Sequence, residues 1–394
     1  MEEPHVRVHA LTGLRMLAAA SVCLSHISGV NPPPGMPTPL RSFLAAGYNG
    51  VTVFFILSGF VLAFNYGDRL GEHMTGRGLW SFAVARFARV YPLYLLVLLW
   101  ILTPTWLAGK PTTHVWQHVL SVQTWSTDIV TAYQYNGPGW SIGVELFLYA
   151  CFPLLLLALR PLRHNVPALL LVAALCVAAS GALVAWFTLT GRAQLPWTDP
   201  SSAHRWLYRM PVTRLGDFVL GMTAAFLLAL APRNRSPWWG RAGQLAGGVT
   251  LVALMSWPQV LGTAQSWDVI YMAPAFFLII GLALSPMTWL ARVLSSRAMI
   301  TLGEASFAFY LLHAPLLAQL HLGKSPTLAE WVFSTAAAMG IVTLAAVGLN
   351  VCVEKPARNL LRSLLDGKGP KDRRPAAPAP APAEHAELLA PSKS

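Results

Sequence analysis

Charged residues are scarce in this sequence: only 11% of its 394 residues are Asp, Glu, Lys or Arg. An average soluble domain carries about twice that fraction. Hydrophobic residues make up 55% of the chain, and the mean hydropathy is +0.51. Packing in water does not need so much apolar surface, whereas a lipid bilayer does. The shortage of charge therefore argues against a soluble enzyme and indicates an integral membrane protein.

Motifs for metal and nucleotide binding are also missing from the sequence. Its 4 cysteines fall inside apolar segments and form no CxxC pair, so we expect them to be small packing residues. The sequence contains no Gly-rich nucleotide-binding motif, no zinc-ligand spacing and no GxSxG elbow. We therefore expect no metal site and no bound cofactor.

The formal net charge is +12, which in a soluble protein would suggest nucleic-acid binding. Here the basic residues lie between apolar segments rather than on one polar face. The positive-inside bias of membrane proteins explains this pattern better. We expect this chain to have a lipid bilayer as its partner, and no nucleic acid.

Ten apolar segments are long enough to cross a bilayer as helices, which takes about 20 residues each. They run approximately over residues 11–30, 50–66, 90–108, 139–159, 167–189, 212–231, 242–261, 269–289, 304–321 and 331–352. Turn-forming runs such as NPPPG separate them. The sequence therefore predicts an all-α fold, a polytopic membrane bundle of about ten transmembrane helices.

The distribution of Lys and Arg predicts an orientation for this bundle. If the N-terminus is cytoplasmic and ten helices alternate, the inner loops and ends hold most of the 28 basic residues. Both termini are therefore expected in the cytoplasm. Four cations break this rule in one outer loop at 190–214: Arg192, Arg205, Arg209 and Arg214. Either this loop is simply solvated, or it contacts an anionic or hydroxylated acceptor.

We predict that the chain divides into a membrane domain at 1–365 and a cytoplasmic tail at 366–394. The tail alternates Pro and Ala with scattered charge, which cannot build a core, so we expect it to be disordered. The stretch VEKPARNLLRSLL before it is typical of a short amphipathic helix on the inner membrane surface.

Ionisable residues inside the apolar segments are the main functional signal, because each is costly unless it is paired or lines a cavity. The first segment carries Arg15, near the cytoplasmic surface, and His26, towards the outer leaflet. Eleven helical steps bring both side chains to one face and separate them by about 16.5 Å along the axis. The structural alternative is a snorkelling Arg and a packing His.

The fourth segment places Glu145 at a depth similar to that of His26, so the two side chains are predicted to be able to interact. Ser141 and Tyr149 lie one turn to either side of Glu145 on the same helical stripe. A buried carboxylate beside an imidazole would orient the ring and stabilise its protonated form. This is the arrangement that a general base needs.

Two further pairs of residues are candidates for substrate contact. Arg86 and Arg89 share one helical face before the third segment and suit phosphate binding, because each guanidinium offers a planar fork of donors. Lipid-headgroup contact is the alternative. In the ninth segment, Tyr310 and His313 lie three residues apart near the midplane. This pair is either functional or a core contact.

Arg214 and Asp217 lie three residues apart at the start of the sixth segment. A local salt bridge is the simplest account of them. Because the pair lies near the predicted outer surface, we also retain it among the candidate substrate-binding residues.

Six short motifs in order resemble the acyltransferase-3 family of integral membrane acyltransferases, over most of residues 10–360. The motifs are Arg15-x10-His26, Arg86-x-x-Arg89, Trp140-Ser141-x-x-x-Glu145, the run RLGDFVLGM with Arg214 and Asp217, the run SFAFYLLHAPL with Tyr310 and His313, and VEKPAR. Each motif alone is weak, but six in the right order form a strong match.

The resemblance implies transfer of an acyl group from a coenzyme A thioester to a hydroxyl. The acceptors that it implies are sugars, glycolipids or macrolide-type antibiotics, and the opening LTGLRMLAAASVCLSH is most similar to the antibiotic-modifying branch. It also implies a multi-pass protein of the bacterial cytoplasmic membrane. Acyl-CoA is then a co-substrate rather than a bound cofactor.

A mechanistic hypothesis joins the residues to the resemblance. The donor phosphates would rest on Arg86 and Arg89, with Arg15 as a third cation, and the thioester would reach His26. His26 would act as general base, held by Glu145. Tyr310 or Ser141 would steady the oxyanion, and the remaining substrate-binding candidates are Trp140, His313, Arg214 and Asp217.

Two other classes of function use the same scarce intramembrane charges. A transporter or exporter of a small organic acid or glycolipid is the first alternative. Internal repeats would favour it, but the two halves of the chain show no convincing repeat. A non-catalytic membrane partner of a glycan-assembly complex is the second.

Overall fold

The computed structural model describes residues 9–30, 32–33, 35–72, 74–232, 236–322 and 327–365. The regular elements within these ranges are all helical, which confirms the predicted all-α class. The predicted disordered tail at 366–394 lies outside the described residues. The outer loop at 190–214 and the predicted amphipathic segment lie inside them.

Each of the ten predicted segments corresponds to a helix. These helices are α1 (His9–Val30), α3 (Gly50–Glu72), α4 (Gly76–Leu107), α7 (Trp140–Leu159), α8 (Val166–Leu189), α9 (Leu215–Leu230), α10 (Trp238–Met255), α11 (Val269–Leu284), α14 (Ser306–Leu320) and α15 (Leu328–Leu349). Shorter helices connect them: α2 (Thr38–Ala45), α5 (Val115–Val119), α6 (Ile129–Tyr133), α12 (Trp289–Leu294), α13 (Arg297–Glu304) and α16 (Lys355–Leu365). The periodicity of the sequence therefore located the helices correctly.

Fewer helices than predicted are long and apolar enough to cross a bilayer. In the described part of the chain seven qualify, or eight if α13 and α14, bent by 63° at their junction, form one broken span. Helix α9 has only 16 residues, and α10 carries Arg241 and Gln244 among its 18. The chain is a polytopic helical membrane protein, and its orientation, with both termini in the cytoplasm, stays a prediction.

Side-chain caps define where several helices begin. Thr75 accepts a hydrogen bond from the Gly78 backbone at the start of α4, and Asn165 does the same for α8. Thr327 and Glu330 form a reciprocal capping box at α15. Such caps satisfy backbone N–H groups that have no partner within the helix.

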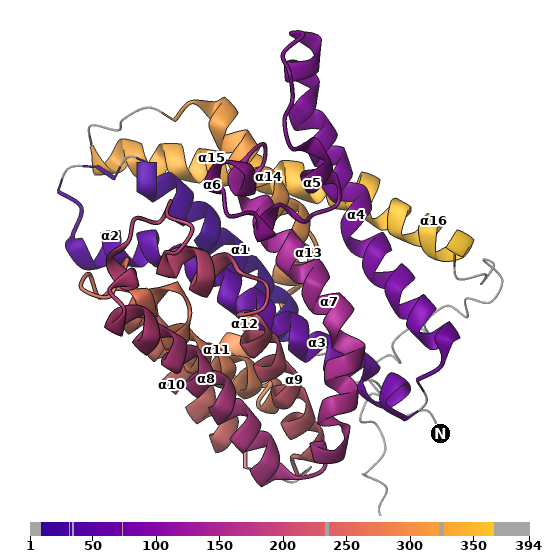
Figure 1. Cartoon of the computed structure of the whole chain (residues 1–394). Coiled ribbons are helices and arrows are strands. Elements are labelled where there is room, and N and C mark those ends of the chain that lie inside the picture. The colour runs from indigo at the N-terminus through magenta and orange to yellow at the C-terminus, as the bar shows by residue number, and fades with distance from the viewer. Residues whose placement is uncertain are drawn as a thin grey trace, which may run out of the picture.

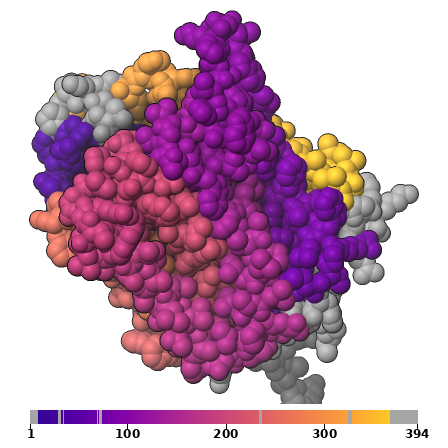
Figure 2. Space-filling model, in the orientation of Figure 1, coloured from indigo at the N-terminus to yellow at the C-terminus, as the bar shows by residue number. Residues whose placement is uncertain are grey.

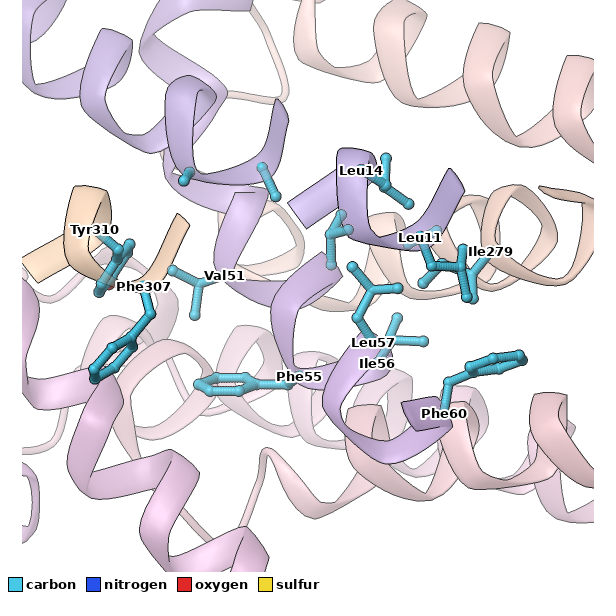
Figure 3. Close-up of a cluster of buried hydrophobic side chains, with 14 of the residues drawn as sticks. Leu11, Leu14, Val51, Phe55, Ile56, Leu57, Phe60, Ile279, Phe307 and Tyr310 are labelled. Atoms are coloured by element: carbon cyan, nitrogen blue, oxygen red, sulfur yellow. The ribbon is translucent and has the colours of Figure 1, made fainter. Parts of the chain in front are cut away.

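Helices α1, α3 and α11 are mostly buried, whereas little of α8 and α15 is buried inside the molecule. In the core, Leu11 and Leu14 of α1 belong to one cluster with Ile56 and Leu57 of α3 (Figure 3). The peripheral helices therefore offer their apolar surface to lipid. The end of α4, with α5, projects beyond the rest of the molecule (Figures 1 and 2).

The predicted amphipathic segment is helical and begins at Lys355 as α16. It lies beside α4, where Trp80 Nε1 donates a hydrogen bond of 3.0 Å to the Leu365 carbonyl. Immediately before α16, Glu354 forms an ion pair with Arg89 of α4. The end of the described chain is thus fixed against the helix that carries the two candidate phosphate-binding arginines.

Helices α3 and α9 approach each other closely because glycines face the opposite backbone. A Cβ atom on Gly59 would lie 1.9 Å from the Phe218 carbonyl oxygen, and one on Gly221 would lie 1.9 Å from that of Ile56. Small residues at helix contacts in membranes allow such approach. This contact fixes α3, which lines the central cavities described below.

A buried ion cluster joins α9 to α11 and α3. Arg214 is fully buried and forms ion pairs with Asp217, at 3.0 Å, and with Asp268. Its guanidinium also donates to the carbonyls of Tyr208, at 2.8 Å, and Trp267, at 3.1 Å. The local salt bridge expected from the sequence is therefore present, and it is one part of a larger cluster.

Replacing Gly59 with Ala should lower the midpoint temperature of thermal unfolding in detergent. The added methyl group meets a backbone carbonyl, and overpacking of this kind costs typically about 1–3 kcal/mol. Gly181→Ala is the matched control, because nothing lies within 4 Å of a Cβ at that position in α8. Equal midpoints for the two variants would contradict the close α3–α9 contact.

Replacing Arg214 with Met should destabilise the protein by about 3–5 kcal/mol, because two buried carboxylates lose their counter-charge. Arg297→Met, an exposed position in α13, is the control and should be nearly neutral. Chemical unfolding followed by tryptophan fluorescence measures both. A loss for Arg214→Met no greater than for the control would show that the cluster does not stabilise the bundle.

Candidate active site

Three cavities lie in a row through the bundle, and the candidate site residues line them. We call the first the arginine cavity. It has a volume of about 60 Å³, and its lining includes Arg15, Arg86, Arg89, Glu145 and Tyr149. Helices α1, α4 and α7 supply these side chains.

The second, or middle, cavity has a volume of about 40 Å³. Arg15 and Glu145 line it as well as the arginine cavity, so the two are adjacent. Ser58, Ser141 and Tyr310 complete its polar lining. On the apolar side, Val51, Phe55 and Phe307 lie around the same space (Figure 3).

The third, or aromatic, cavity is the largest of the three, at about 360 Å³. Its walls include His26, Tyr310 and His204 together with six large aromatic side chains: Tyr48, Tyr133, Trp140, Trp197, Tyr208 and Trp267. Tyr310 also lines the middle cavity. The three cavities therefore follow one another from the arginines at one end to the His26 imidazole at the other, and α1 carries residues that line each of them.

His26 faces the aromatic cavity with an exposed side chain. Its Nδ1 lies 2.8 Å from the Val22 carbonyl oxygen one turn earlier. A carbonyl only accepts, so this contact assigns the ring proton to Nδ1. Nε2 is then the nitrogen with a lone pair, able to take a proton from a group in the cavity.

The imidazole neighbour of His26 is His313 of α14. The two ring centroids lie 5.0 Å apart, edge to face. His313 is fully buried, and its Nδ1 lies 2.6 Å from the Tyr310 carbonyl oxygen. The structure thus brings Tyr310, His313 and His26 together, although the sequence predicted only the Tyr–His half of this group.

The predicted contact between His26 and Glu145 is absent from the described residues. Glu145 instead accepts hydrogen bonds from Tyr149 and, at 3.3 Å, from Ser58. The reason is helical geometry: Ser141 of α7 reaches Tyr310, and Glu145 lies one turn, about 6 Å, further along the axis. That turn places the carboxylate beside Arg15 rather than beside the imidazole.

The hydroxyls of Ser141 and Tyr310 meet where the middle and aromatic cavities join. They lie 2.9 Å apart, and both are close to the Pro138 carbonyl oxygen, at 3.0 and 3.4 Å. Trp140, the neighbour of Ser141, lines the aromatic cavity. The start of α7 therefore supplies two hydrogen-bonding groups and a ring near His26.

Arg86 and Arg89 both line the arginine cavity, but their surroundings differ. Arg89 is paired with Glu354, whose other oxygen accepts a 3.1 Å hydrogen bond from Asn350. Arg86 donates to the Tyr66 hydroxyl at 3.2 Å and lies over the Tyr149 ring. Within the described residues Arg86, like Arg15 in the same cavity, forms no ion pair, so its guanidinium is available to an anionic ligand.

Arg214 and Asp217 line none of the three cavities. Their predicted role as substrate contacts is therefore not supported, because the buried ion cluster occupies both. Two other cations of the 190–214 loop are also used internally. Arg209 donates to the carbonyls of Thr124 and Ser126, and Arg205 to that of Pro200.

Sequence reasoning missed most of the aromatic cavity and the partner of Arg89. Trp197, His204 and Tyr208 come from the same outer loop that the sequence singled out for its arginines. The sequence therefore pointed to the correct loop, but it did so through the arginines, whereas the residues that line the cavity are aromatic side chains and a histidine. Glu354 was noted within a motif, but nothing in the sequence linked it to Arg89.

The arrangement offers a cation at one end of a passage, a hydroxyl pair at its centre and a basic nitrogen at the other end. Such groups suit binding of an anion and removal of a proton from a hydroxyl. Within the described residues no cluster of His, Cys, Asp and Glu could hold a metal ion.

Comparison with known proteins agrees with this chemistry. The family model described as an acyltransferase domain matches residues 8–349. The acyltransferase MdmB of Streptomyces mycarofaciens is 31% identical over 399 residues, which cover 96% of this chain and 96% of that protein. The peptidoglycan O-acetyltransferase OatA of Listeria monocytogenes is 23% identical, and the match covers 79% of this chain.

The match spans only about half of OatA, 49% of its length. No solved structure matches the chain. Since the family model covers most of the sequence and MdmB is similar almost end to end, the chain belongs to the acyltransferase-3 family of membrane acyltransferases.

Proposed function

We propose that this protein transfers an acyl group from an acyl-CoA thioester to a hydroxyl of a sugar, glycolipid or macrolide-type acceptor. The observation that carries the proposal is the row of three cavities between Arg86 and His26. A coenzyme A thioester has anionic phosphates at one end and its reactive carbonyl at the other. It therefore needs a cationic site and a catalytic base separated by a long passage.

In this proposal the donor enters from the arginine cavity. Arg86 binds the donor phosphates through its planar donor fork. Arg15 and Glu145 line the passage that the pantetheine arm follows through the middle cavity. The thioester carbonyl then lies near the junction formed by Ser141 and Tyr310, within reach of the aromatic cavity.

The chemical step uses His26 as general base. Its Nε2 takes the proton from the acceptor hydroxyl while the oxygen attacks the thioester carbon. The negative charge moves onto the carbonyl oxygen, where the Ser141 or Tyr310 hydroxyl donates a hydrogen bond. The carbon–sulfur bond then breaks, and the His26 imidazolium returns the proton to the departing thiolate of coenzyme A.

Glu145 was expected to orient His26. In this proposal His313 and the Val22 carbonyl orient it instead. The Val22 carbonyl fixes the tautomer, and the edge of the His313 ring restricts rotation of the imidazole. Glu145 is more useful as the counter-charge beside Arg15. We place the protein in the bacterial cytoplasmic membrane, with the arginine cavity at the cytoplasmic end where acyl-CoA is made.

His26→Ala should reduce turnover by about 10²–10⁴-fold, the usual contribution of a positioned general base. The measurement is acceptor-dependent release of coenzyme A thiol by membranes or by purified protein. His164→Ala, an exposed histidine between α7 and α8, is the control and should keep full activity. Wild-type turnover by folded His26→Ala would remove His26 from the mechanism, and transport without thiol release would favour an exporter.

Arg86→Ala should raise the KM for acyl-CoA by roughly tenfold or more, with a smaller change in kcat, because a charge-assisted contact to phosphate is lost. Arg77→Ala, exposed at the start of the same helix, is the matched control. Arg89→Ala is a poorer test, since it leaves Glu354 buried without its partner and should lower stability. An unchanged KM in Arg86→Ala would assign this arginine to anchoring.

A further inference from the structure

The aromatic cavity lies beyond His26 from the arginines, on the side that the donor does not occupy. Its large aromatic rings come from segments far apart in the sequence, between residues 48 and 267. If the donor fills the arginine and middle cavities, this third space is where the second substrate can meet His26. The chemistry of its walls then shows what that substrate can be.

The cavity walls are held in place by contacts among the rings. Trp140 and Tyr208 lie 4.7 Å apart between centroids, as do His204 and Trp267. Tyr48 lies 5.3 Å from Trp267. Aromatic rings at such separations attract one another in edge-to-face and offset arrangements. The walls therefore form a preorganised surface rather than a collapsed group of loose side chains.

The buried ion cluster supports the same walls. Arg214 donates to the backbone carbonyls of Tyr208 and Trp267, and so holds two ring-bearing residues from different segments. The Tyr208 hydroxyl donates to the Tyr48 carbonyl at 3.2 Å. Arg214 thus stabilises the cavity wall without lining it, because it binds the backbone of two residues that do.

The lining of the aromatic cavity contains no Asp, Glu, Lys or Arg. Burial, with a further contribution from the positive charge of Arg209, lowers the pKa of His204 to about 3. His204 is consequently neutral at physiological pH. Its Nε2 lies 3.4 Å from the Tyr133 hydroxyl, which is long for a hydrogen bond, so either group can exchange this contact for one to a ligand hydroxyl.

The volume of about 360 Å³ lies near the lower end of the range of pockets that bind small molecules. Flat aromatic faces bind the C–H faces of saturated rings, while tyrosine hydroxyls and a neutral imidazole bind hydroxyl groups. A carboxylate or phosphate would lose its hydration here without gaining a cation. The walls therefore favour an uncharged, ring-bearing polyol of a few rings.

We infer that the aromatic cavity is the acceptor site and that it selects an uncharged glycoside, stacked on Trp267 and hydrogen-bonded by His204 and Tyr133. One hydroxyl of the bound ring then faces Nε2 of His26. The inference rests on the proposed acyltransferase function for the identity of the ligand as acceptor. The binding itself can be measured without turnover.

The experiment compares two probes that differ by one charge: p-nitrophenyl β-glucoside and p-nitrophenyl β-glucuronide. Saturation-transfer NMR on the full chain in lipid nanodiscs detects binding of either sugar at millimolar concentration. The wild-type protein should bind the glucoside roughly tenfold more tightly than the glucuronide. Equal binding, tighter binding of the glucuronide, or no binding of the glucoside would overturn the inference.

Two variants locate the binding site. Trp267→Leu should weaken glucoside binding by roughly tenfold, since the stacked ring is lost. Trp238→Leu, an exposed tryptophan of α10 outside the cavity lining, is the matched control and should leave binding unchanged. His204→Gln, a milder change, should also weaken binding, and it keeps the test valid if Trp267→Leu unfolds. Wild-type binding in folded His204→Gln and Trp267→Leu would overturn the assignment.

Failure of the inference and failure of the proposed function give different results. If the protein releases thiol from acyl-CoA but the glucoside does not bind in this cavity, only the acceptor site is wrong. If the glucoside binds and His204→Gln weakens it, while no acyl-CoA is consumed with any acceptor, the cavity binds sugars but the acyltransferase proposal is wrong.

Discussion

The buried ion cluster of Arg214, Asp217 and Asp268 is the interaction on which the candidate site depends. Three ionisable groups inside an apolar bundle are tolerated because the guanidinium pairs with both carboxylates and because carbonyl groups accept its other hydrogen bonds. Those carbonyls belong to Tyr208 and Trp267. Because burial of Arg214 is costly without these hydrogen bonds, they hold in place two segments that form part of the wall of the aromatic cavity.

The same constraint separates structural arginines from available ones. Arg209 donates to two backbone carbonyls, Arg214 donates to carbonyls and carboxylates, and Arg89 has Glu354. Arg86 keeps only a tyrosine hydroxyl and aromatic faces as partners, beside a cavity. A cation without a counter-charge is costly in a bundle, so an anionic ligand is the group that would best satisfy it.

The cavities also explain how a single helix can serve two substrates. Helix α1 carries Arg15 beside the arginine and middle cavities and His26 beside the aromatic cavity. Because both side chains project from one face of the same rigid helix, their separation is set by backbone geometry rather than by flexible loops. A donor that spans that separation can place its reactive end at the base while its charged end stays with the arginines.

Much of the fold could be predicted because a local run of about 20 apolar residues is enough to indicate a membrane helix. The apolar segments predicted the helices. The spacing of Arg15 and His26 predicted that these two side chains lie on one face of α1. In the described part of the chain seven helices, or eight with the bent pair, meet the length and hydropathy of a span, against ten predicted, because α9 has only 16 residues and α10 carries Arg241 and Gln244. The predicted contact between His26 and Glu145 is absent, and Glu145 lies one helical turn too far along α7. Equal depth in the bilayer does not specify the direction in which a side chain points.

The sequence by itself determined that this chain is an all-helical membrane acyltransferase with an arginine and a histidine in line on its first helix. These properties follow from local periodicity and from motifs of adjacent residues. Only the tertiary structure decided that Glu354 pairs with Arg89, that His313 contacts His26, and that aromatic rings from distant segments enclose one cavity. Such contacts depend on how helices pack across hundreds of residues, and local hydropathy carries no record of that packing.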